Sequence, residues 1–192
     1  MTPLTLEQLQ VGLLDLIKDR PTDASDPYLA GVAGSDALLL VREISASWRA
    51  ISLDTHAPLT TTLLRQRGHL VDEMVELMQV RGLSPFHADL RDGFLLQAMD
   101  HPDPIVVAVA SFEQALAGVA DGTVQSDLAV DWTVDPYPVL GALLSGQVIP
   151  DLPPAPHRCV VGPSVAGGFR VEAIPWMRRP SADGDVEQQR SD

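Results

Sequence analysis

The chain has 192 residues, a formal net charge of −13 and a single cysteine, Cys159. One cysteine excludes an internal disulfide, and no apolar run reaches the roughly 20 residues of a membrane span. The N-terminus lacks the basic start and apolar stretch of a signal peptide. Residues 178–192 carry three Arg and four acidic residues, so the remaining body carries −12. We therefore expect a cytoplasmic protein with neither a membrane nor a nucleic acid as partner.

The first 120 residues follow helical patterns. Thr5 and Gln8 have capping-box spacing, and apolar residues follow at 6, 9, 13 and 17. The stretch 20–35 is typical of a loop. Further helices are predicted over 36–50, from Pro58, over 70–81, from Ser84 to Met99 and over 104–119. Residues 1–122 are therefore expected to form a bundle of five or six helices.

The pattern changes after residue 122. Apolar and polar side chains alternate over 128–134, Pro136 starts a short helix that Gly146 ends, and two β-like runs flank a Gly-rich loop between 157 and 174. The predicted fold class is therefore mainly α with a small C-terminal α+β part over 123–177, whose small antiparallel sheet ends in a β-hairpin. Residues 178–192 lack an apolar stripe and are predicted to be a disordered tail.

No catalytic, metal-binding or cofactor-binding constellation emerges from the residues. The chain has no G-x-S-x-G, P-loop or G-x-G-x-x-G pattern, and its histidines are not clustered at metal-ligand spacing. His157 and Cys159 stand two residues apart, so on a strand they point the same way. A Cys–His nucleophile is one interpretation, but a free cysteine more often packs as a buried hydrophobe.

Glu113 interrupts an otherwise apolar helix. A carboxylate among core positions needs a partner, and we predict a structural ion pair with Arg42 or Arg49 that holds the helices in register. A functional role for Glu113 is the alternative.

The terminal hairpin offers the most unusual surface. A small sheet has two edges, and an unprotected edge accepts an extended peptide through main-chain hydrogen bonds. A hairpin that packs on the bundle and covers its own edge is the other interpretation. The predicted peptide-binding residues are Arg158, Cys159, Val160, Val161, Phe169, Arg170, Val171, Glu172 and Ile174.

Four stretches, in this order, carry a family resemblance: "LTLEQLQVGLLDLI", "SPFHADLRDGFLLQAM", "VASFEQALAGV" and "VDWTVDPYPVLGALLSG". The chain resembles the partner subunits of multinuclear non-haem iron enzymes that modify ribosomally made peptides, as in methanobactin, thiaglutamate and bufferin-type pathways. Members combine a helical N-terminal domain, often labelled DNA-binding, with a small C-terminal α/β domain. Many carry a Tyr-Arg pair where this chain has Val41 and Arg42, which leaves the subfamily open.

The resemblance implies a non-catalytic accessory subunit in natural-product biosynthesis. The iron would belong to a separate barrel-fold enzyme that forms a heterodimer with this chain, and no cofactor is expected here. This chain would bind the leader of a precursor peptide as an added strand beside Arg158–Val161 or Phe169–Ile174. The alternatives are a stand-alone scaffold or regulator that binds proteins through its helical face, and a small Cys159-dependent enzyme.

Overall fold

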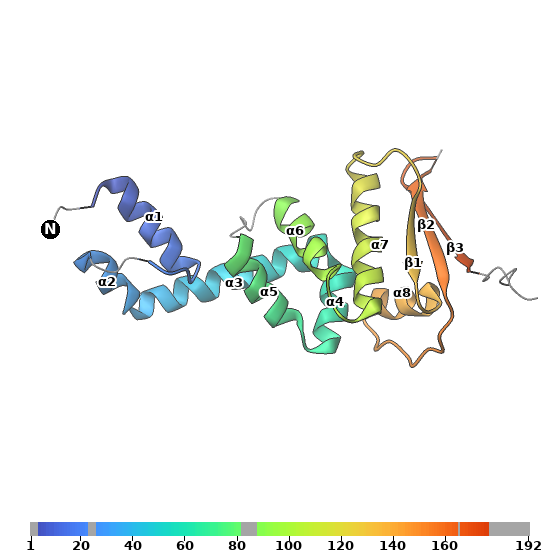
Figure 1. Cartoon of the computed structure of the whole chain (residues 1–192), viewed down its shortest axis with the longest axis horizontal. Coiled ribbons are helices and arrows are strands. Elements are labelled where there is room, and N and C mark those ends of the chain that lie inside the picture. Colours follow the sequence, from blue (N-terminus) through green and yellow to red (C-terminus); the bar gives the residue numbers. More distant parts are fainter. Residues whose placement is uncertain (1–3, 23–25, 82–87, 165, 177–192) are drawn as a thin grey trace, which may run out of the picture.

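The structure, a computed structural model, describes residues 4–22, 26–81, 88–164 and 166–176. Within these ranges the chain forms eight helices and one three-stranded antiparallel sheet, and it is 59% helical (Figure 1). The predicted fold class is thereby confirmed. The helices are α1 Leu6–Ile17, α2 Pro27–Ala33, α3 Asp36–His56, α4 Pro58–Arg67, α5 Leu70–Arg81, α6 Ala88–Ala98, α7 Pro104–Ala120 and α8 Pro136–Leu144. The strands are β1 Leu128–Trp132, β2 His157–Pro163 and β3 Phe169–Pro175.

Helix α2 lies within residues 20–35, which the sequence pattern predicts to be a loop. The Asp26 side chain accepts hydrogen bonds from the backbone N–H groups of Tyr28 and Leu29, and Pro27 occupies the first helical turn. These are standard helix-start devices, because the first N–H groups of a helix lack partners within it. Seven described helices therefore precede the sheet, where five or six were expected, and α3 extends past residue 50 to His56.

The sheet has the order β1-β2-β3, and each strand is antiparallel to its neighbour. One face packs on α7 through Val130, Trp132, Cys159 and Val161, all of which are buried. The Trp132 ring meets the Phe112 ring of α7 edge to face, with 6.1 Å between centroids. Alternation along β1 thus turns Val130 and Trp132 inward, as the sequence predicted.

One hydrophobic core joins the helices to the sheet. It contains residues from the end of α3, from α4 to α8, and from β1 and β2, with Phe94, Val109 and Val161 fully buried. The change at residue 122 is therefore a change of secondary structure inside a shared core. The predicted tail over 178–192 lies outside the described residues.

Helices α1, α2 and the first half of α3 extend away from this core (Figure 1). We call them the arm, and everything from the second half of α3 onward the body. The arm has its own small buried cluster of Leu16, Leu29 and Leu38. Helices α1 and α2 approach so closely that a Cβ on Gly12 would lie 2.6 Å from a Leu29 methyl carbon. Leu6, expected on the inner stripe of the first helix, is exposed.

Candidate functional site

The β2–β3 hairpin has one open side. Ser164 N–H donates to Gly168 O at 3.1 Å at the loop, and Trp176 N–H donates to Pro156 O at 2.9 Å at the other end. Main-chain groups alternate in direction along an antiparallel pair. Residues 170, 172 and 174 therefore bond to β2, whereas the N–H and C=O groups of 169, 171 and 173 point away from it. Among the described residues, no backbone or side-chain partner meets these outward groups.

One of the two predicted peptide-binding edges, Arg158–Val161, is wrong, because β2 is the central strand of the sheet. Arg158–Val161 pairs with β1 on one side and with β3 on the other, so its backbone has no room for an added strand. Cys159 and Val161 also point into the core, which removes their side chains from any peptide-binding surface. The sequence located the hairpin but could not tell which of its strands lay at an edge.

The remaining predicted residues divide between the two faces of the sheet. Arg158, Val160, Arg170, Glu172 and Ile174 lie on the outer face, whereas Phe169 and Val171 share the inner face of Cys159 and Val161 at the β3 edge. Phe169, Arg170, Glu172 and Ile174 are exposed. Val160 and Val171 are half-buried. The β3 edge therefore presents Phe169 and Val171 on its inner face, and both signs of charge with an aliphatic side chain on its outer face, beside the open backbone groups.

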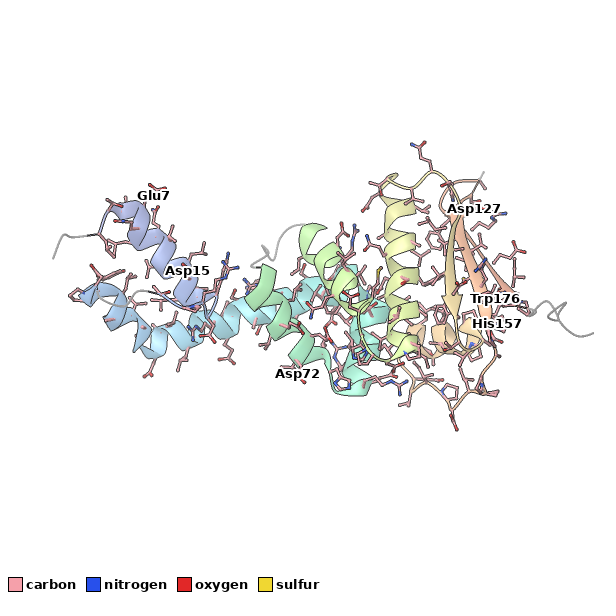
Figure 2. The ribbon with its side chains drawn as sticks, viewed as in Figure 1. Glu7, Asp15, Asp72, Asp127, His157 and Trp176 are labelled. Atoms are coloured by element: carbon pink, nitrogen blue, oxygen red, sulfur yellow. The ribbon has the colours of Figure 1, made fainter. Side chains whose placement is uncertain are left out.

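Two ion pairs cross the outer face of the sheet: one joins β2 to β1, and the other joins β3 to the residue that precedes β1. Arg158 Nε donates to Asp131 at 2.8 Å, and its guanidinium lies 5.0 Å from the centroid of the Trp176 ring. Arg170 reaches Asp127 at 2.5 Å. Asp127 and Trp176 stand at opposite ends of the sheet (Figure 2). Asp127 and Trp176 carry no signal in the sequence, because only the strand pairing brings them to this face.

The Asp127–Arg170 pair depends on Gly162, which lies between its two partners on β2. A Cβ at Gly162 would come within 2.0 Å of Asp127 Oδ1. The absent side chain therefore lets Arg170 of β3 and Asp127, which directly precedes β1, meet above the central strand.

Cys159 is a packing residue in this arrangement. Its side chain is fully buried, and burial raises the pKa of the thiol to about 11. The thiol is therefore protonated near neutral pH, and a thiol is a far weaker nucleophile than a thiolate. His157 Nδ1 lies 2.7 Å from Ala155 O, within its own strand connection. This geometry weighs against the Cys159-dependent enzyme.

Glu113 does not form the predicted ion pair with Arg42 or Arg49. Its two carboxylate oxygens accept hydrogen bonds from the backbone N–H groups of Leu59 at 2.8 Å and Thr60 at 2.9 Å. The residue that precedes α4, Ala57, has no side chain able to cap it. Glu113 therefore caps α4 from α7, which joins the two helices through a buried carboxylate. Burial raises the pKa of Glu113, and the two backbone hydrogen bonds oppose this effect.

Both arginines are engaged elsewhere. Arg42 donates to Leu16 O at 2.6 and 2.8 Å and pairs with Asp19 at 2.8 Å, so it fastens the C-terminal end of α1 to α3. Arg49 is buried and donates to Ser45 Oγ at 2.7 Å. The predicted ion pair is therefore wrong: Arg42 joins α3 to the end of α1, and the Arg49–Ser45 bond lies within α3.

The described part of the chain contains no group of three or more His, Cys, Asp or Glu side chains placed to hold a metal ion. None of its helices combines the length and apolarity that crossing a membrane requires. Comparison of the chain with protein-family models, with curated proteins and with solved structures finds no match.

Proposed function

We propose that this chain is a non-catalytic partner subunit of a multinuclear iron enzyme of barrel fold, and that it binds the leader of a ribosomally synthesised precursor peptide. The leader adds as a fourth strand to the outer edge of β3. The iron and the chemistry belong to the partner, and the two chains form a heterodimer.

The open backbone of β3 is the observation that carries this proposal. Phe169, Val171 and Ala173 direct their N–H and C=O groups away from β2, as the alternation of antiparallel pairing requires. Strand addition uses such groups for affinity and neighbouring side chains for specificity. The exposed side chains of Phe169, Glu172 and Ile174 can provide this specificity.

The β3 edge is favoured over the β1 edge. Strand β3 has seven residues and β1 has five, so β3 offers more main-chain groups. At the end of β1, Thr133 O already accepts a hydrogen bond from Ala155 N–H at 3.0 Å. Holding a leader here raises the effective concentration of the attached core peptide at the partner's metal site.

The test replaces Val171 with Pro. Its N–H points outward, so Val171→Pro removes a donor for the peptide without removing a β2–β3 hydrogen bond. We expect about tenfold weaker binding of a synthetic leader, taken from a precursor encoded beside this gene, in isothermal calorimetry. The matched control is Ala129→Pro, which removes an outward N–H from the β1 edge and should leave the affinity unchanged.

Two results would overturn the proposal. Equal affinities of the wild type and Val171→Pro would exclude strand addition at this edge. Turnover of the precursor by this chain alone, after removal of metal, would exclude a non-catalytic subunit.

A further inference from the structure

Helix α3 carries an apolar stripe that nothing in the described part of the chain covers. Ala37, Val41, Ile44, Trp48, Ile51 and Thr55 follow one another at alternating intervals of four and three residues. This spacing places them in one line along the helix, as in the seam of a coiled coil. All six are exposed, and Ile44, Trp48 and Ile51 expose 48%, 54% and 56% of their surface. We call these six residues the α3 seam.

The seam is not the face that α3 uses for folding. Leu38 packs in the arm cluster, and Leu53 packs in the core of the body. Leu38 and Leu53 hold the two ends of α3 by packing on one side of the helix. The seam runs along a different side and is exposed. A groove of about 330 Å³ follows it, lined by Leu40, Glu43, Ile44, Ser47, Trp48 and Ile51.

The length of the seam suits a helical partner. From Ala37 to Thr55 it runs about 27 Å at 1.5 Å per residue. A contiguous apolar surface of this kind on a soluble protein marks an interaction site, because single exposed apolar residues are normal but a continuous line of them is not. Its register already matches the a and d positions that receive the apolar side chains of a second helix.

The charges beside the seam define which partner fits. Asp36, Glu43 and Asp54 lie along one flank, at intervals that return to the same side of the helix. Asp54 pairs with Arg65 at 2.7 Å, whereas Asp36 and Glu43 form no ion pair with another residue of the described ranges. Arg42 lies on the opposite side of α3, where it is held by Leu16 O and Asp19. The exposed flank is therefore acidic.

We propose that the α3 seam binds an amphipathic helix of another protein, with apolar residues at four-three spacing and Lys or Arg along the edge that meets the acidic flank. A second copy of this chain fits less well, because antiparallel pairing of two seams sets acidic flank against acidic flank, and charges beside a seam select the partner. This inference does not depend on the proposed function.

The probe is a 21-residue synthetic helix with the α3 sequence, residues 36–56, in which the three flanking acids are changed: Asp36→Lys, Glu43→Lys and Asp54→Lys. The unchanged α3 peptide keeps the seam but carries the acidic flank of a second copy. We expect the labelled basic peptide to bind the full chain at least tenfold more tightly than the unchanged peptide in fluorescence anisotropy. That preference should shrink as salt rises, because salt screens exposed charges.

Variants of the full chain locate the binding. Ile44→Glu should abolish binding of the basic peptide, and the milder Ile51→Gln should weaken it several-fold. Val71→Glu is the matched control: Val71 is an exposed valine on α5, outside the seam, and its variant should bind normally. Circular dichroism checks that each variant keeps its helices.

The proposal is overturned if neither peptide binds, if both bind equally, or if Ile44→Glu binds as well as the wild type. It is also overturned if sedimentation shows a dimer of the wild type that Ile44→Glu dissociates. That last result would assign the seam to a second copy.

Discussion

The arm and the body bury very different amounts of apolar surface. Among the described residues, the core of the body joins 25 buried residues, whereas the cluster of the arm has three. A unit of about 40 residues rarely buries enough apolar surface to fold alone. The arm instead depends on α3, which continues from one region into the other. One long helix can thus hold a weakly packed region in place and keep an apolar face free for a partner.

Phe94→Ala should have the largest effect, because Phe94 is fully buried in the body. Loss of its ring is expected to lower the free energy of unfolding by about 3–5 kcal/mol. The sheet should be lost together with the helices, since they share one core. Urea unfolding measures the loss of stability. Tryptophan fluorescence and circular dichroism, recorded in the same titration, show whether the sheet and the helices unfold together. Separate transitions for sheet and helices would contradict the shared core.

Leu38→Ala should loosen the arm and spare the body. Leu38 is one of three buried residues in the arm cluster, so its truncation is expected to cost the arm about 2 kcal/mol or more. Amide exchange in α1 and α2 should accelerate, while α7 and β2 keep their protection. Equal acceleration in α7 would show that arm and body unfold as one unit.

Glu113→Gln tests the junction where α7 caps α4 inside the body. An amide offers one oxygen where the carboxylate offers two, so one of the N–H groups of Leu59 and Thr60 loses its acceptor. We expect the free energy of unfolding to fall by about 1–3 kcal/mol. Urea titrations measure it, and an unchanged value would mean that the cap contributes nothing.

Glu113→Gln also tests how the stability of the fold depends on pH. Burial raises the pKa of Glu113 above its ordinary 4.5. The folded chain therefore keeps the proton at pH values where the unfolded chain has released it. The wild type should lose stability relative to Glu113→Gln as pH rises from 4.5 through the raised pKa. If the difference in free energy of unfolding between the wild type and Glu113→Gln stays constant over this pH range, the raised pKa is contradicted.

Ile44→Glu should have the smallest effect on stability. Ile44 is exposed on the α3 seam, outside both buried clusters. Substitutions at such positions usually change stability by no more than about 0.5 kcal/mol. Thermal unfolding checks this value, and a large loss would mean that the seam supports the arm instead of a partner.

Local signals in the chain predicted most helices correctly. The Thr5–Gln8 capping box and the Asp103–Pro104 start are both present, because capping requires only neighbours in sequence. Helix α2 was missed although its Asp26–Pro27 start is visible, since seven residues are too few for apolar periodicity to stand out. The exposed seam of α3 was also invisible, because the same apolar stripe is typical of a core.

Sequence alone determined the helical start signals, the inward face of β1 and the presence of a terminal hairpin, because each depends on spacing of two to four residues. Tertiary structure decided which strand lies in the centre, since β1 reaches β2 across a helix and a long connection. It also decided the partner of Glu113, which is a backbone 53 and 54 residues away. Contacts between distant segments depend on how whole elements pack, and no local pattern encodes that choice.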